Sequence, residues 1–193
     1  AFTIFGFICL FLFYTAAAFT PHELDSKKER FTIYDINNNI LYETNFKKEL
    51  TWTPIEEIPE NVKQAVVAVE DKRFYQHHGF DVIRITKALI SNLMEGRIVE
   101  GGSTITQQMA KNLFLSNEQT FTRKLEELFY AARLEMQYDK DAILEGYLNT
   151  LYYGHGVYGI KEAADFFFGL PLNELDNAQL AMLIGIPNGP SLY

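Results

Sequence analysis

An apolar periodicity near 3.6 residues begins close to residue 61, continues almost to the C-terminus, and constrains this fold more than any other feature. Its first stripe has the i, i+3, i+4, i+7 spacing of one buried helix face, at Val62, Ala65, Val66 and Val69. Further stripes predict helices over residues 82–95, 103–115, 122–138, 139–153, 159–168 and 173–186. The chain has 193 residues, of which 48% are apolar, so it can bury one core but not two large ones. We therefore expect a mainly α-helical domain.

The N-terminal segment differs from the rest in composition. Residues 1–19 carry no charge, and residues 2–14 are rich in Phe, Ile and Leu. The length of this apolar segment is just sufficient for a transmembrane helix. The alternative is a cleaved secretory signal, because residues 16–18 are alanines. Aromatic and β-branched residues on both sides of an Asn-rich turn predict a small β-hairpin over 31–46. The expected organisation is an anchor over 1–19, a juxtamembrane linker with the hairpin over 20–50, and a helical domain over 51–193.

Charge and cysteine content exclude several classes of protein. The formal net charge is −8 and both signs are mixed along the chain, so nothing indicates a nucleic-acid groove. Cys9 is the single cysteine, which excludes a disulfide framework and a cysteine-based metal site.

An acidic pair ends the first apolar stripe, within the segment V-E-D-K-R-F-Y-Q-H-H-G-F-D at 69–81. Glu70 lies near the expected helix C-terminus, where the negative end of the macrodipole disfavours an anion. A carboxylate in such a place suits a general base. The alternative is a surface Glu-Asp pair beside a core helix, with His77 as a structural histidine.

A glycine-rich segment precedes the helix expected over 103–115. Thr104 and Gln107 have the spacing of a capping box, and free N–H groups at such a helix start suit a phosphate. Lys111 adds a positive charge one turn further on. An ordinary capped helix is the alternative.

Three charged residues share one face of the helix expected over 122–138. Arg123 and Lys124 stand four and three residues before Glu127. As part of an active site they would form a fork of cations for a diphosphate, with a carboxylate between them. The alternative is a set of surface salt bridges.

In this order and spacing, these segments resemble the glycosyltransferase domain of class A penicillin-binding proteins and the monofunctional peptidoglycan glycosyltransferases (glycosyltransferase family 51). The resemblance covers roughly residues 50–192. Its blocks are E-D-K-R-F-Y-Q-H-H-G-F-D at 70–81, G-G-S-T-I-T-Q-Q-M-A-K-N at 101–112, R-K-L-E-E at 123–127, K-D-A-I-L-E-G-Y-L-N at 140–149 and G-H-G-V-Y-G-I-K-E-A-A-D-F-F-F-G at 154–169.

The resemblance implies a lysozyme-like, mainly helical head beside the membrane, acting on lipid II. Glu70 would be the general base for the acceptor hydroxyl. Glu127 would be a second catalytic carboxylate on the donor side, with Mg²⁺ or Mn²⁺ as an optional ion at the donor pyrophosphate. The other residues that the resemblance assigns to the substrate site are Asp71, Phe74, His77, Lys87, Thr104, Gln107, Gln108, Lys111, Arg123, Lys124, Glu145, Tyr147 and Asn149.

The resemblance also implies a lipid-facing segment over 82–99. Its apolar residues form a surface wider than one core stripe, broken by Arg84 and Lys87, as in an interfacial helix. A core helix with snorkelling cations is the alternative. The apolar residues are Ile83, Ile85, Leu89, Ile90, Leu93, Met94, Ile98 and Val99.

We therefore expect a peptidoglycan glycosyltransferase on the outer side of the bacterial cytoplasmic membrane, held by a single-pass anchor. Its partners would be lipid II, the growing glycan strand, the membrane and cell-wall synthesis proteins. A transpeptidase domain could follow in a longer protein, because the domain expected over 51–193 stops short of the family's usual end. The rival functions are a lysozyme-like peptidoglycan hydrolase and a catalytically silent lipid II-binding module.

Overall fold

The computed structural model describes Thr15 and residues 32–34, 40–43, 52–97, 99, 101–115 and 120–192. Its longer helices are α2 (Glu60–Glu70), α3 (Val82–Glu95), α4 (Ile105–Phe114), α5 (Phe121–Gln137), α6 (Lys140–Thr150), α7 (Ile160–Phe168) and α8 (Asn177–Gly185). Short 3₁₀ turns are η1 (Ile55–Glu57), η2 (Phe74–Gln76), η3 (Leu172–Glu174) and η4 (Ile186–Asn188). The prediction of a mainly helical domain is confirmed.

The N-terminal part is described at few positions. Strand β1 (Thr32–Tyr34) pairs antiparallel with β2 (Ile40–Glu43), with an irregularity between Ile33 and Tyr34. The remainder of the hairpin expected over 31–46 lies outside the described residues. So does the predicted anchor over 1–19, apart from Thr15. Among the helices that the structure describes, none combines the length and the apolar character needed to cross a bilayer.

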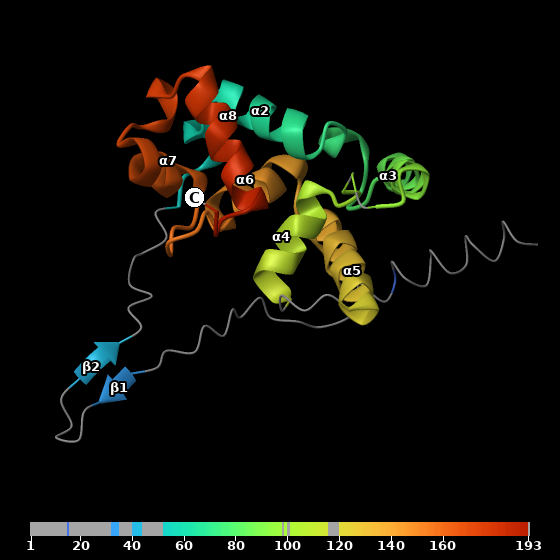
Figure 1. Cartoon of the computed structure of the whole chain (residues 1–193), viewed down its shortest axis with the longest axis horizontal. Helices are drawn as coiled ribbons and strands as arrows, with labels where there is room; N and C mark the ends of the chain where they lie inside the picture. The colour runs from blue at the N-terminus through green and yellow to red at the C-terminus, as the bar shows by residue number, and fades with distance from the viewer. Residues whose placement is uncertain are drawn as a thin grey trace, which may run out of the picture.

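Helix α4 packs against both α5 and α6 (Figure 1). Ile105 and Ala110 of α4 are fully buried. At Gly146 of α6 a Cβ would lie 2.4 Å from Cε of Met109, so a side chain there would displace the flexible end of Met109. Helix α2 packs against α8, which closes the other side of the core. The packing of α4 matters because this helix carries two adjacent glutamines of the candidate site, Gln107 and Gln108.

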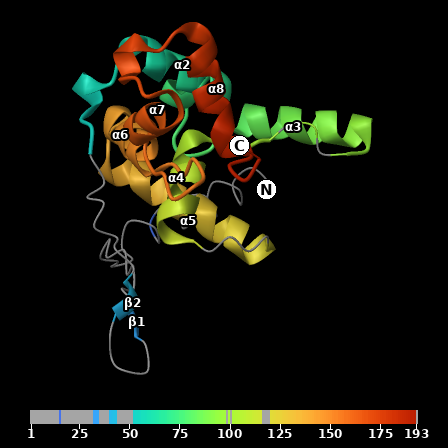
Figure 2. The same cartoon turned by 60° about the vertical axis from the view of Figure 1, so that its left-hand side comes forward.

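Helix α3 differs from the others, because it extends away from the helical body (Figure 2). Among its residues, all of which are described, Ala88 is the buried one. Asp81 caps its N-terminus and Gly96 ends it in the left-handed conformation, with φ of +63°. The alternative of a core helix is therefore wrong. Its exposed apolar residues are Val82, Ile83, Ile85, Leu89, Ile90, Leu93 and Met94, and Val99 beyond it is also exposed. Ile98 lies outside the described residues.

Candidate active site

Glu70 is the last residue of α2, and its half-buried carboxylate accepts two hydrogen bonds from distant segments. Nε2 of Gln108 donates to Oε2 over 3.0 Å. Nδ2 of Asn188, in the 3₁₀ turn η4, donates to Oε1 over 3.4 Å. Asn188 was not among the sequence candidates, because nothing local links it to a residue 118 positions away. The two amides fix the carboxylate while leaving it in partial contact with solvent.

The orientation of the Gln108 amide is set in turn by Tyr147 of α6. The Tyr147 hydroxyl donates to Oε1 of Gln108 over 3.2 Å, which turns the amide nitrogen of Gln108 towards Glu70. Burial, and to a smaller extent the charge of Glu70, raises the pKa of Tyr147 above its usual range. The phenol therefore remains protonated and stays a donor at neutral pH. Glu70, Gln108 and Tyr147, predicted separately, form one chain of hydrogen bonds.

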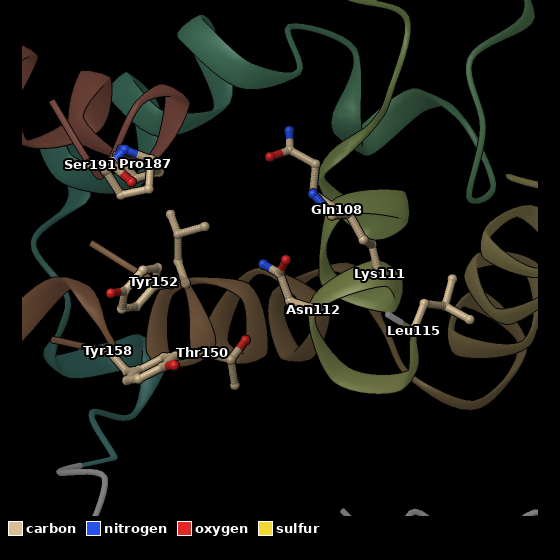
Figure 3. A pocket seen from close by; sticks show the side chains of 11 residues that line it. Gln108, Lys111, Asn112, Leu115, Thr150, Tyr152, Tyr158, Pro187 and Ser191 are labelled. Atoms are coloured by element: carbon tan, nitrogen blue, oxygen red, sulfur yellow. The ribbon is translucent and has the colours of Figure 1, made fainter. Parts of the chain in front are cut away.

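A cavity of about 700 Å³ lies beside this chain, between α4, the segment after α6 and the C-terminal turn. Figure 3 shows Gln108 and Lys111 of α4 on one side of it and Tyr152 and Tyr158 on the other. The two tyrosine rings lie 4.8 Å apart between centroids. Of the residues predicted for the site, Gln108 and Lys111 line the cavity. Tyr158 belongs to the fifth block of the resemblance and Tyr152 lies two residues before that block, but neither is a candidate from the sequence.

Glu127 of α5 stands at the centre of a second cluster. Its side chain is buried, at 2% exposure, and accepts from Nη1 of Arg123 over 2.8 Å and from Nζ of Lys124. The predicted shared face is confirmed, but the alternative of surface salt bridges is wrong, because the carboxylate is buried. Lys124 also donates to Oγ of Ser103, over 2.9 Å. Glu127 thus holds both cations, and Lys124 in turn contacts the segment that leads into α4.

The start of α4 is tied to the first block of the sequence. The predicted capping box is present: the Thr104 hydroxyl oxygen accepts from the Gln107 backbone, and the Gln107 side chain accepts from the Thr104 backbone. Asp71 accepts from the backbone N–H of Ile105 over 3.1 Å and contacts Nε2 of His77 at 2.9 Å. The N–H groups of Ile105 and Gln107 are therefore not free for a phosphate, contrary to the expectation for this helix start. Asp71, His77 and Thr104 act as structural supports.

Four further candidates lie away from the cavity. Phe74 is fully buried beneath Lys140, whose Nζ lies 4.4 Å from the ring centroid. Glu145 and Asn149 bind the segment that leads into the helical domain: Glu145 accepts from the indole of Trp52 over 2.6 Å, and Asn149 exchanges two hydrogen bonds with the Thr53 backbone. The fourth candidate, Lys87, is exposed on α3.

The residues around Glu127 do not fit a resident divalent ion. Such ions take several oxygen ligands, and Mg²⁺ is usually held by one or two carboxylates that are free to coordinate, together with substrate phosphates. Here Arg123 and Lys124 already occupy the carboxylate. Over the described ranges, there is no group of three or more His, Cys, Asp or Glu side chains placed to hold a metal.

Comparison with known proteins shows which sequences this chain resembles. The model of the family described as Transglycosylase matches residues 37–193. Penicillin-binding protein 2D of Bacillus subtilis (strain 168) is 47% identical over 161 residues, which is 83% of this chain and 23% of that protein. Penicillin-binding protein 1F of the same strain is 50% identical over 139 residues, covering 72% of this chain and 20% of that protein. Penicillin-binding protein 1A of Aquifex aeolicus (strain VF5) is 44% identical over 161 residues, which is 83% of this chain and 22% of that protein. The chain spans about a fifth of the length of these relatives.

Proposed function

The chain belongs to the Transglycosylase family, and from this premise we propose that it is a peptidoglycan glycosyltransferase, which polymerises lipid II into β-1,4-linked glycan strands. The observation that carries the proposal is the Glu70 carboxylate, fixed by Gln108 and Asn188 beside a cavity of about 700 Å³. A cavity of this volume is of the size that accepts a sugar-sized ligand.

On the acceptor side, we propose that Glu70 is the general base. Its carboxylate would take the proton from the 4-hydroxyl of the acceptor sugar as that oxygen attacks. A base must lie within hydrogen-bond reach of the proton that it removes, and its position must be maintained through the reaction. The hydrogen bonds from Gln108 and Asn188 supply that restraint.

On the donor side, the attacking oxygen forms a bond to C1 while the bond from C1 to the pyrophosphate oxygen breaks. The bonding electrons leave with undecaprenyl pyrophosphate, and the configuration at C1 inverts. This step needs stabilisation of the negative charge on the departing diphosphate. Lys111 in the cavity and the pair Arg123 and Lys124 provide positive charge for it. We assign to buried Glu127 the role of orienting these two cations.

Membrane attachment is part of the proposal. The exposed apolar face of α3 suits contact with lipid, and so does the anchor predicted over 1–19. A catalytic domain at the outer face of the bacterial cytoplasmic membrane would meet lipid II there. A lysozyme-like head agrees with the mainly helical body.

The test is incubation of the chain with purified lipid II in detergent, with the products sized on a gel. Long glycan strands support the proposal. Release of soluble fragments from preformed peptidoglycan, without strand growth, would instead identify the hydrolase. Binding of lipid II without elongation would identify the silent module. One observation argues against the hydrolase. Hydrolysis of a bond between two sugars releases no diphosphate, so the cations held by Glu127 would have no negatively charged leaving group to stabilise.

A further inference from the structure

The first two turns of α3, called here its root, contact the rest of the helical body at several points, although the rest of α3 is exposed. Asp81 caps α3 by accepting from the backbone N–H of Arg84 over 2.8 Å. Asp81 also forms an ion pair with Arg73. Gly102 lies close against the first turns of α3, since a Cβ there would meet Cα of Ile85 at 3.4 Å. The position of α3 is therefore determined in its first two turns.

Arg84 adds further contacts, because its side chain extends from α3 to the backbone of the proposed active site. Nη1 donates to the backbone carbonyl of Glu70. Nε donates to the carbonyl of Gly101 over 3.2 Å. Nη1 also lies 3.8 Å from Oδ1 of Asp71, and the Arg84 side chain is 29% exposed. One guanidinium thus joins α3 to two further segments: the end of α2 with the adjoining Asp71, which supports α4, and the glycine loop (residues 101–103).

Each of these contacts has a physical reason. The carbonyl of Glu70 stands at a helix C-terminus, where carbonyls lack a partner within the helix and a cation is favoured by the macrodipole. Oδ1 of Asp71 is buried and, in the part of the chain that the structure describes, accepts no hydrogen bond. Arg84 is the cation beside it. A planar guanidinium has several donors in fixed directions, so it can hold two carbonyls at once, whereas an ammonium cannot do so with the same geometry.

We propose that Arg84 is a positioning residue, which fixes the backbone of Glu70 and the glycine loop to the root of α3. The rate of strand growth then depends on the position of α3 relative to these two segments. This inference rests on the proposed function, because it assumes that Glu70 is the base. The role is mechanical, since Arg84 bonds the Glu70 backbone and leaves the carboxylate free for the substrate. A displacement of about 1 Å at a reacting group can lower a rate by about 100-fold.

The experiment compares Arg84→Gln, Arg84→Lys and the control Arg97→Gln in the whole chain. Arg97 lies just beyond the far end of α3 and is exposed, so the control makes the same change of charge away from the body. For each variant, kcat and KM for lipid II and the thermal unfolding temperature are measured. We expect Arg84→Gln to lower kcat by roughly 10- to 100-fold, with KM changed by no more than about twofold. Arg84→Lys should recover part of kcat, and Arg97→Gln should equal the parent.

Several outcomes would overturn the inference. One is a kcat for Arg84→Gln equal to that of Arg97→Gln. Another is a loss of activity fully explained by the folded fraction, measured by circular dichroism at the assay temperature. A third is a full recovery of kcat by Arg84→Lys, because a single ammonium would then serve as well as the guanidinium that holds two carbonyls. Failure of the proposed function gives a different result, because the parent would then not elongate lipid II, or Glu70→Gln would elongate it as well as the parent.

Discussion

The side-chain amide of Gln108 donates to the Glu70 carboxylate over 3.0 Å, although 38 positions separate the two residues. Its neighbour Gln107 points to the other acidic residue, with Nε2 lying 3.4 Å from Oε1 of Glu127. Consecutive residues of a helix point about 100° apart. One turn of α4 therefore holds both carboxylates in place, on two sides of the same buried helix.

Glu70→Gln should fold like the parent and lose strand growth, because the amide keeps the size of the side chain but cannot accept a proton. General bases contribute about 100- to 10,000-fold to a rate, so we expect kcat to fall by at least about 100-fold. Polymerisation of lipid II, sized on a gel, measures the effect. Glu60→Gln, on the same helix but exposed, should polymerise normally. Substantial strand growth by Glu70→Gln would remove this residue from its assigned role.

Tyr147→Phe should lower kcat moderately while the core remains packed. The ring is buried, at 1% exposure, and the substitution removes the hydroxyl that orients Gln108. A hydrogen bond of this kind contributes about 1 kcal/mol, so we expect a loss of about fivefold. Initial rates at saturating lipid II test this, with the exposed Tyr138→Phe as the control. An unchanged kcat would mean that the Gln108 amide does not need the phenol.

Glu127→Gln should impair both activity and stability. Arg123 and Lys124 would lose the buried carboxylate that holds them, so their charges would repel each other across α5. We expect unfolding to become easier by about 1–3 kcal/mol and strand growth to fall severely. Urea unfolding and polymerisation assays measure these effects. The adjacent Glu126→Gln is the matched control, because Glu126 is exposed. Normal activity in Glu127→Gln would show that the cations need no such support.

The ion pair between Arg73 and Asp81 predicts a pH-dependent stability. The hydrogen bond from Arg73 lowers the pKa of Asp81 from its usual value of 3.8. A carboxyl group whose pKa is lower in the folded state stabilises the fold above its unfolded value, and this contribution is lost as the pH falls through the folded value. Arg73→Gln should therefore lower the stability of the fold at pH 7, and the difference from the parent should shrink progressively below pH 3.8.

Thermal unfolding of the parent and Arg73→Gln at pH 7 and at about pH 2 tests this prediction. The exposed neighbour Lys72 supplies the control, as Lys72→Gln. A difference between parent and Arg73→Gln that stays constant with pH would show that Asp81 is not the group responsible.

The exposed face of α3 should contact lipid. Leu93 and Met136 are both exposed and apolar, at 73% and 46%, but lie on α3 and α5 respectively. Tryptophan introduced as Leu93→Trp should be quenched strongly by brominated lipids in vesicles, and Met136→Trp should be quenched less. Trp52, the single native tryptophan, gives the background signal. Equal quenching of the two variants would contradict a lipid-facing role for α3.

The local features of the site could be predicted from the sequence. The capping box of Thr104 and Gln107 involves residues three positions apart. The charged face of α5 likewise follows from the three- and four-residue spacing before Glu127. A predicted helix bound differs from the observed one where the capping residue is counted as part of the helix. Residue 103 was the expected first residue of α4, but Thr104 is the cap and Ile105 begins the helix.

The contacts that join these features could not be read from local spacing. Nothing near Asn188 marks it as a partner of Glu70, and nothing near Arg84 marks the carbonyl of Glu70 as its acceptor. The Ile105 N–H at the α4 N-terminus, expected to be free, is instead bonded to Asp71, which lies 34 positions away in the chain.

The sequence by itself determined which segments are helical, where they are capped and which charges share a face, because these properties depend on residues within about one helical turn. Only the tertiary structure decided which side chains meet across the cavity, which carboxylate is buried, and that α3 stands away from the core. Those outcomes depend on how α2, α4, α5, α6 and the C-terminal turn pack, and packing brings together groups whose separation in the chain carries no periodic signal.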